Sequence, residues 1–198
     1  GWTTPISVPS GNATLRVPSV SLYATGSDTM YKVPISAKEY FLVENRNRDV
    51  AKNGQTLTMK WNGQTIQKTF TGDTDHFTNT NIDSTAVYGT VVDVEDLDWS
   101  LPGFINDKNN FTGGLLLWHI DETIIEKNIA GNTINADPNK RGVDVEEADG
   151  SQDIGQQYGI TDGGSGSEDG SPIDYWFAGN PSPIFKKEFS ETSNPNSL

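Results

Sequence analysis

The sequence predicts an all-β fold, an antiparallel β-sandwich with one short helix and long acidic loops. Three observations predict it: short β-type runs separated by turn residues up to about residue 101, one strong hairpin signal, and two strand-length apolar segments. The chain has 198 residues. We therefore expect one β domain over residues 1–190, with a hairpin insert at about 50–98 and a disordered tail or linker at 191–198.

The hairpin signal is the dipeptide Asn62-Gly63, which stands between the β-type runs 57–61 and 65–70. A two-residue hairpin turn needs positive φ at both positions, and Asn followed by Gly meets that need best. Residues 86–94, rich in Val and Tyr, form a further strand candidate that leads into an acidic stretch.

Residues 39–44 and 114–121 are the two most apolar strand candidates. Near-continuous hydrophobicity is typical of strands buried on both faces, so we place the two side by side at the centre of the sheet. Arg46 follows the first strand, and we expect it to neutralise Asp121 or Glu122 at the end of the second. For Glu44 a structural role is favoured, with a cation shared between Glu44 and Asp121 as the alternative.

One short helix is expected after the second central strand. Thr123-x-x-Glu126 has the pattern of a capping box, which predicts a helix over 123–129 with Gly131 at its end. From residue 150 onward Gly, Ser, Asp and Gln dominate, and 162–170 is predicted to be an irregular loop.

The charge balance limits the partners of the chain. There are 27 acidic and 14 basic residues, a formal net charge of -13. Nucleic acids and anionic membrane surfaces are polyanions, so we expect neither as a partner, and cations are the natural counter-charge. No apolar run approaches the roughly 20 residues that span a bilayer, so no membrane insertion is expected.

No catalytic residue is predicted. The histidines are His76 and His119, and neither belongs to a His-Glu-x-x-His motif; a Gly-x-Ser-x-Gly elbow is absent too. For His119 we expect a hydrogen-bonded interior position rather than a metal ligand. Four tryptophans are candidates for stacking on sugars, although such residues more often belong to a core: Trp61, Trp99, Trp118 and Trp176.

The acidic loops have the chemistry of a calcium site. Calcium takes six to eight oxygens from Asp, Glu, Asn and backbone carbonyls, and the segments 121–149 and 162–174 supply such groups. If 142–149 is a strand, Glu147 and Asp149 share one face and Asp144 shares the other with Glu146, so only one pair can line a site. A solvated acidic surface with Asp and Asn in turns is the alternative. The candidate metal ligands are Asp121, Asn132, Asn135, Asp137, Asp144, Glu147, Asp149, Asp162, Asp169 and Asp174.

Several strings, taken in order, carry a family resemblance. They are the residues 39–46 (EYFLVENR), 101–103 (LPG), 114–122 (GLLLWHIDE) and 142–150 (GVDVEEADG), preceded by Gly1-Trp2-x-x-Pro5. In this order they resemble the region that follows the catalytic module in the immune-inhibitor-A family of secreted bacterial zinc metallopeptidases. The acidic loop 162–170 with Asp174-Tyr175-Trp176 is similar to a Gly-rich stretch of that family.

The resemblance implies a secreted, non-catalytic accessory β region of structural and calcium-binding function. Proteolysis and zinc would belong to a missing upstream peptidase module of the same protein, which would be its partner. The parent protein would then be a zinc metalloendopeptidase, while this segment alone is expected not to be an enzyme. The alternative is a carbohydrate- or surface-binding β-sandwich module whose partners are cell-surface or extracellular glycans.

Overall fold

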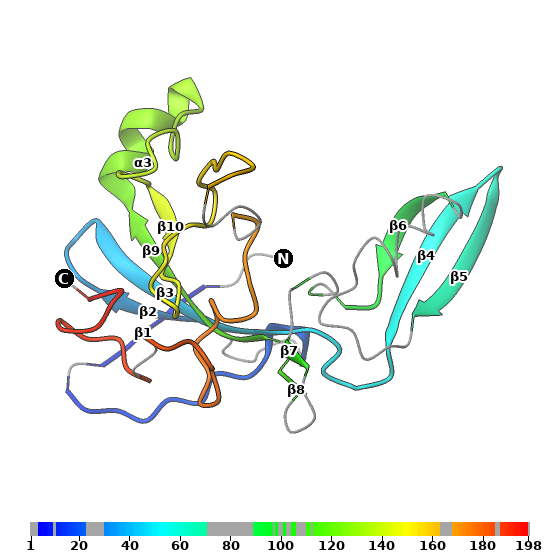
Figure 1. Cartoon of the computed structure of the whole chain (residues 1–198), viewed down its shortest axis with the longest axis horizontal. Helices are drawn as coiled ribbons and strands as arrows, with labels where there is room; N and C mark the ends of the chain where they lie inside the picture. Colours follow the sequence, from blue (N-terminus) through cyan, green and yellow to red (C-terminus); the bar gives the residue numbers. More distant parts are fainter. Residues whose placement is uncertain are drawn as a thin grey trace.

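The computed structural model describes residues 4–9, 11–22, 30–70, 89–96, 98, 101, 104–105, 110–111, 113–162, 168–184 and 187–197. Within these ranges the chain consists mainly of strands in sheets dominated by antiparallel pairs, with one short α-helix (Figure 1). The predicted all-β, sandwich-like fold class is therefore confirmed.

The main sheet has five strands in the order β1-β2-β3-β9-β10. Its β1–β2 pair is parallel and the other three pairs are antiparallel. The strands are β1 (Ile6–Ser7), β2 (Met30–Pro34), β3 (Glu39–Asn47), β9 (Gly113–Asp121) and β10 (Val143–Val145).

Strands β3 and β9 lie at the centre of this sheet, side by side as predicted. They pair along their whole length, from Glu39 opposite Asp121 to Asn47 opposite Gly113. We expected both faces of these strands to be buried, but most of their residues are half-buried. The second sheet stands apart from the main sheet in Figure 1, so it does not bury a face of the main sheet. Irregular segments cover the main sheet instead.

The predicted hairpin is confirmed and belongs to a second sheet with the order β5-β4-β6. Its strands are β4 (Gln55–Trp61), β5 (Gln64–Phe70) and β6 (Thr90–Val94). At the turn Asn62 has φ 46° and Gly63 has φ 78°, the two positive values that the sequence requires. In Figure 1 this sheet projects from the main sheet as an arm.

The arm has a small apolar core of its own. Leu57 and Met59 of β4 are fully buried, Phe70 of β5 packs with them, and Val91 and Val94 of β6 lie against this cluster. Shorter elements are a 3₁₀ turn η1 (Val20–Leu22) and the two-residue strands β7 (Phe104–Ile105) and β8 (Asn110–Phe111), which pair with each other.

The helix α3 (Glu122–Asn128) follows β9 directly and continues into a 3₁₀ turn η2 (Ile129–Gly131). The prediction placed the cap at Thr123, and this is wrong by two residues. Asp121 is the N-cap, and its Oδ1 accepts the backbone N–H groups of Thr123 at 2.8 Å and Ile124 at 3.1 Å. A carboxylate at this position also interacts favourably with the positive end of the helix dipole.

The chain beyond β10 returns to the main sheet. Where β10 ends, Trp176 exchanges two backbone hydrogen bonds with Leu115 of β9, at 3.0 and 3.1 Å. The N–H of Ala148 donates to the carbonyl of Asp174 at 2.9 Å. Leu117, Ala148 and Trp176 form a buried cluster here. The segment around residue 174 is thus held beside residues 147–149.

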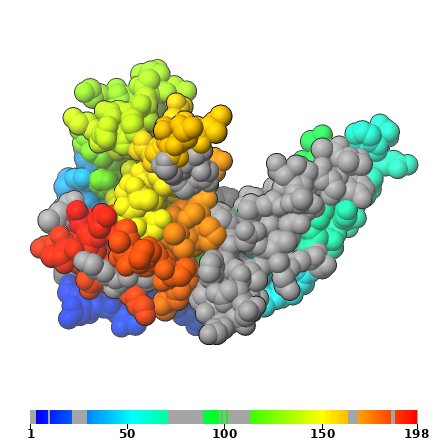
Figure 2. Space-filling view, in the orientation of Figure 1, coloured from blue at the N-terminus to red at the C-terminus, as the bar shows by residue number. Residues whose placement is uncertain are grey.

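The end of the described chain packs onto this region. Residues 191–197, which the sequence assigns to a tail, include a buried Ser193. The side-chain amide of Asn194 donates to the carbonyl of Gly150 at 3.3 Å. Figure 2 shows the C-terminal residues, coloured orange to red, against the yellow segment that follows β10.

Candidate metal centre

Three carboxylates converge where β10 ends and the C-terminal segment joins β9. One oxygen from each of Glu147, Asp149 and Asp174 lies within 4.8 Å of the other two, so the group can hold a metal ion. Glu147 is fully buried, Asp174 is 3% exposed, and Asp149 is half-buried. Among the residues that the structure describes, no other group of three or more His, Cys, Asp or Glu side chains has this geometry.

A tight turn after β10 brings Glu147 and Asp149 to the same side. The N–H of Gly150 donates to the Glu147 carbonyl at 2.9 Å, and Gly150 takes the positive φ of 73° that the turn needs. The Ser151 hydroxyl bridges both carboxylates, at 3.0 Å to Glu147 and 2.6 Å to Asp149. The pair expected from strand alternation is therefore together, but β10 ends at Val145 and a turn produces the pairing.

Each carboxylate is fixed by local donors. Both oxygens of Glu147 accept backbone N–H groups at 2.9 Å, one from Asp153 and one from Ile154. Asp174 accepts the N–H and the hydroxyl of Ser171. The sequence contained a signal for these donors that our prediction did not use: Ser171 stands three residues before Asp174, and Ser151 two residues after Asp149, which are spacings of local side-chain turns.

The electrostatics of the group suit a cation. Burial raises the pKa of Asp174 to about 7, and the charges of Asp149 and Glu147 add to the increase, against the hydrogen bonds from Ser171. Burial also raises the pKa of Glu147, opposed by the N–H groups of the loop. Next to them, burial and the charges of Asp144 and Glu147 raise the pKa of Glu146 to about 7. A bound cation would offset this repulsion.

The other seven predicted ligands do not join this group. Asp121 caps α3, and Asn132 ends η2 in the left-handed conformation. Asn135 forms hydrogen bonds with the backbone of Gly142 and Val143, and Asp137 and Asp162 accept local N–H groups. Asp144 pairs with Arg141, and Asp169 is exposed. Most of them therefore have the turn and capping roles that are common for Asp and Asn.

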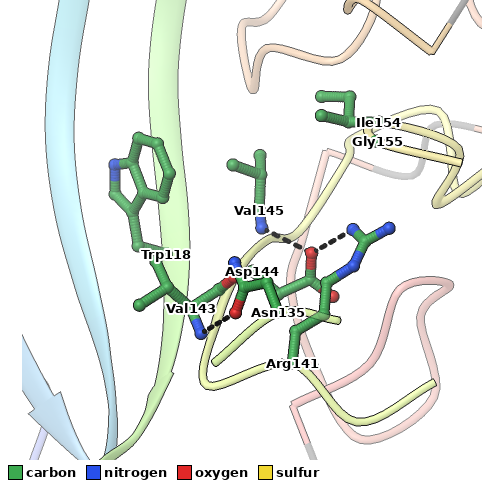
Figure 3. Close-up of a pocket in the computed structure, with 8 residues that line it drawn as sticks. All are labelled: Trp118, Asn135, Arg141, Val143, Asp144, Val145, Ile154 and Gly155. Atoms are coloured by element: carbon green, nitrogen blue, oxygen red, sulfur yellow. Dashed lines mark hydrogen bonds and ion pairs between the residues drawn. The ribbon is translucent and has the colours of Figure 1, made fainter. Parts of the chain in front are cut away.

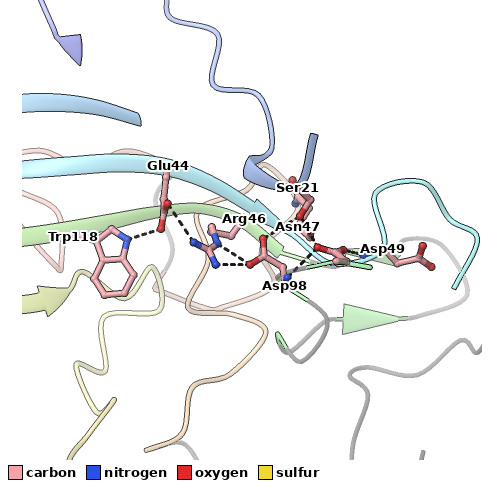
Figure 4. A network of polar contacts seen from close by, with 8 residues as sticks. Ser21, Glu44, Arg46, Asn47, Asp49, Asp98 and Trp118 are labelled. Carbon is pink, nitrogen blue, oxygen red and sulfur yellow. Dashed lines mark hydrogen bonds and ion pairs between the residues drawn. The ribbon is translucent and has the colours of Figure 1, made fainter. Parts of the chain in front are cut away.

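The ion pair predicted for Arg46 forms with other partners. Arg46 donates from Nε to Asp98 at 2.8 Å and lies 3.5 Å from Glu44 (Figure 4). The antiparallel register explains the error, because it places Arg46 opposite Gly114, at the other end of β9 from Asp121. Glu44 has the favoured structural role: it accepts the indole N–H of Trp118 at 2.9 Å.

The remaining histidine and tryptophan expectations are met in part. His119 is half-buried, bonds to Glu39 at 3.0 Å and lies with its ring centroid 5.3 Å from that of Phe41. His76 and Trp99 are outside the described residues. Trp176 is buried and Trp61, at the hairpin, is 47% exposed.

Comparisons of the chain with protein-family models, with curated proteins and with solved structures found no match. In the described part of the chain, no helix has the length and apolar character needed to cross a membrane.

Proposed function

We propose that this chain is a calcium-binding, non-catalytic accessory β region that acts beside the peptidase module of a secreted zinc metallopeptidase. The observation that carries the cation part is the convergence of Glu147, Asp149 and Asp174. Two segments separated along the chain meet there, and each delivers a carboxylate that is already oriented by hydrogen bonds.

The ligand chemistry favours calcium over zinc. All three groups are carboxylates, which are hard oxygen ligands, whereas zinc sites are built mainly from His nitrogen and Cys sulfur. The chain has no cysteine, and His119, the histidine that the structure describes, does not belong to the group. Carboxylates can bind calcium with one or both oxygens, and carbonyls or waters complete the six to eight positions.

The peptidase assignment is supported by the ordered sequence strings. Residues 39–46 and 114–122 lie in and directly after the central strands β3 and β9, while 142–150 and 174–176 meet at the carboxylate group. Four of the segments that carry the resemblance thus contribute to the two central strands or to the candidate metal centre. The absence of a His-Glu-x-x-His motif supports a non-catalytic role for this segment.

The calcium proposal is tested by calorimetric titration of the chelator-treated chain, with magnesium as the comparison ion. Asp149→Asn is the informative variant, because Oδ1 accepts both hydrogen bonds from Ser151 and Asn keeps that oxygen while losing the charge. Asp137→Asn is the matched control: it removes one charge from an exposed turn and keeps the acceptor for Asn139.

We expect saturable calcium binding in wild type and in the Asp137 variant, and its loss in the Asp149 variant. Equal binding by the two variants would contradict the site, and preference for magnesium would contradict the assignment of the ion. The peptidase part is tested separately on the gene: an upstream module that encodes His-Glu-x-x-His supports it, and an upstream region without one contradicts it.

A further inference from the structure

A cavity lies beside β10, and none of the three carboxylates lines it. It is a cavity of about 240 Å³ between β9, β10 and the loop at residues 154–155 (Figure 3). Typical ligand pockets measure roughly 300 to 1,000 Å³, so this one accepts a single small ring.

The walls of the cavity combine an apolar surface with one ion pair. Trp118 contributes an indole, and Val143, Val145 and Ile154 contribute aliphatic groups. In Figure 3 the indole of Trp118 and the guanidinium of Arg141 stand on opposite sides of Val145.

The ion pair joins Arg141 to Asp144 at 2.7 Å. The Arg141 side chain is 9% exposed and that of Asp144 is 26% exposed, so both are held in the wall. Arg has five N–H donors, and a carboxylate accepts several hydrogen bonds. The pair can therefore offer donors and acceptors to a ligand while its net charge is zero.

The polar side of the cavity is rigid. Asn135 accepts the N–H groups of Gly142 and Val143 and donates to the carbonyl of Val143, which ties the loop before β10 to the strand. In the opposite wall, a carboxylate oxygen of Glu147 accepts the backbone N–H of Ile154. Gly155 has φ 74°, and a Cβ there would lie 3.6 Å from Nη2 of Arg141, so the loop lies close against the guanidinium.

We propose that this cavity binds one neutral pyranose ring, a single monosaccharide unit. The apolar face of such a ring suits the indole and the aliphatic wall, and its hydroxyl groups suit a paired donor and acceptor. A charged ligand suits the site less well, because Asp144 already neutralises Arg141. The net charge of -13 also repels anions. This proposal does not rest on the proposed calcium binding, although Glu147 of the carboxylate group accepts a hydrogen bond from Ile154 in the cavity wall.

The test is a titration followed by ¹⁵N-labelled NMR of the full chain, with the indole and guanidinium N–H signals as reporters. The probes are the methyl glycosides of glucose, galactose and mannose, with glucuronic acid as the anionic comparison. Val143→Phe fills the cavity, and Trp61→Ala is the control, because Trp61 is an exposed aromatic residue that does not line the cavity. Asp144→Asn, which keeps one acceptor oxygen, replaces Val143→Phe if that variant loses signal dispersion.

We expect a neutral glycoside to shift the Trp118 and Arg141 signals in a saturable way, in wild type and in Trp61→Ala. Val143→Phe should abolish the shifts, and Asp144→Asn, which removes the ion pair with Arg141, should weaken them. The proposal is overturned if no neutral glycoside shifts these signals, if only glucuronic acid does, or if the shifts disappear in Trp61→Ala and persist undiminished in the cavity variants. Calcium titration of the same samples reports the metal centre separately, so failure of one site is distinguishable from failure of the other.

Discussion

Replacing Asp174 by Asn should stabilise the cation-free protein and abolish its response to calcium. The substitution keeps the local hydrogen bonds: an Asn oxygen can still accept the N–H of Ser171, and its amide can donate to the Ser171 hydroxyl, which is free to rotate. What it removes is a buried charge. These opposite effects separate a cation site from a purely structural cluster.

The magnitude follows from the pKa of Asp174, which burial and neighbouring carboxylates raise from 3.8 to about 7. Between these pH values the folded state binds the proton and the unfolded state does not, so wild-type stability falls by about 1.4 kcal/mol for each pH unit. Asn does not titrate. The difference in unfolding free energy should therefore grow from about pH 4 and level off above about pH 7, near 4 kcal/mol in favour of the variant.

The assay is urea unfolding followed by tryptophan fluorescence, at several pH values in chelator and again with calcium. With calcium at about 100 times its dissociation constant, wild type should gain about 2.7 kcal/mol and the variant nothing. Titrating groups away from this cluster are shared by both proteins and cancel in the difference. A variant that is less stable than wild type at pH 8 in chelator, or that gains equally from calcium, would refute the reasoning.

Five further substitutions at four positions test the fold by the same assay. Asp121→Ala removes the α3 N-cap and should lower the unfolding free energy by about 1 kcal/mol, while Asp121→Asn should lower it less. Arg46→Met leaves the fully buried carboxylate of Asp98 without its guanidinium and should cost about 3 to 5 kcal/mol; a cost under about 1 kcal/mol contradicts the pairing. Gly63→Ala meets no atom within 4 Å and should cost about 1 kcal/mol, for its positive φ alone. Gly113→Ala should cost at least about twice as much, because its Cβ would run into the Arg46 carbonyl; equal costs would contradict that close approach.

The elements that could be predicted from the sequence are those fixed by short-range chemistry. Asn62-Gly63 determines a hairpin turn locally, and the two apolar segments had to pair because each needs cover. Contacts that depend on register were mispredicted. The ends of β3 and β9 were taken to meet at Arg46 and Asp121, whereas an antiparallel pair places these residues at opposite ends.

The residue types of the candidate site could be predicted from the sequence, but the particular residues that form it could not. Asp and Glu in loops indicate calcium chemistry, yet the same residues cap helices and close turns, as Asp121 and Asp137 do here. The decisive step is the backbone pairing of Trp176 with Leu115, which carries Asp174 to Glu147. That contact joins residues far apart in sequence, and local patterns contain no information about it.

The position of the three carboxylates has a consequence for a chain without cysteine. Glu147 and Asp149 lie at one end of the segment 150–173 and Asp174 at the other, so an ion that binds all three closes this segment into a loop. That is a reversible cross-link of the kind that disulfides make permanently. Unlike a disulfide, an ion that dissociates on unfolding leaves the entropy of the unfolded chain unchanged, so its stabilisation comes from selective binding to the folded state and grows with the calcium concentration. The calcium concentration around the protein would then set how tightly the C-terminal quarter of the chain is held against the main sheet.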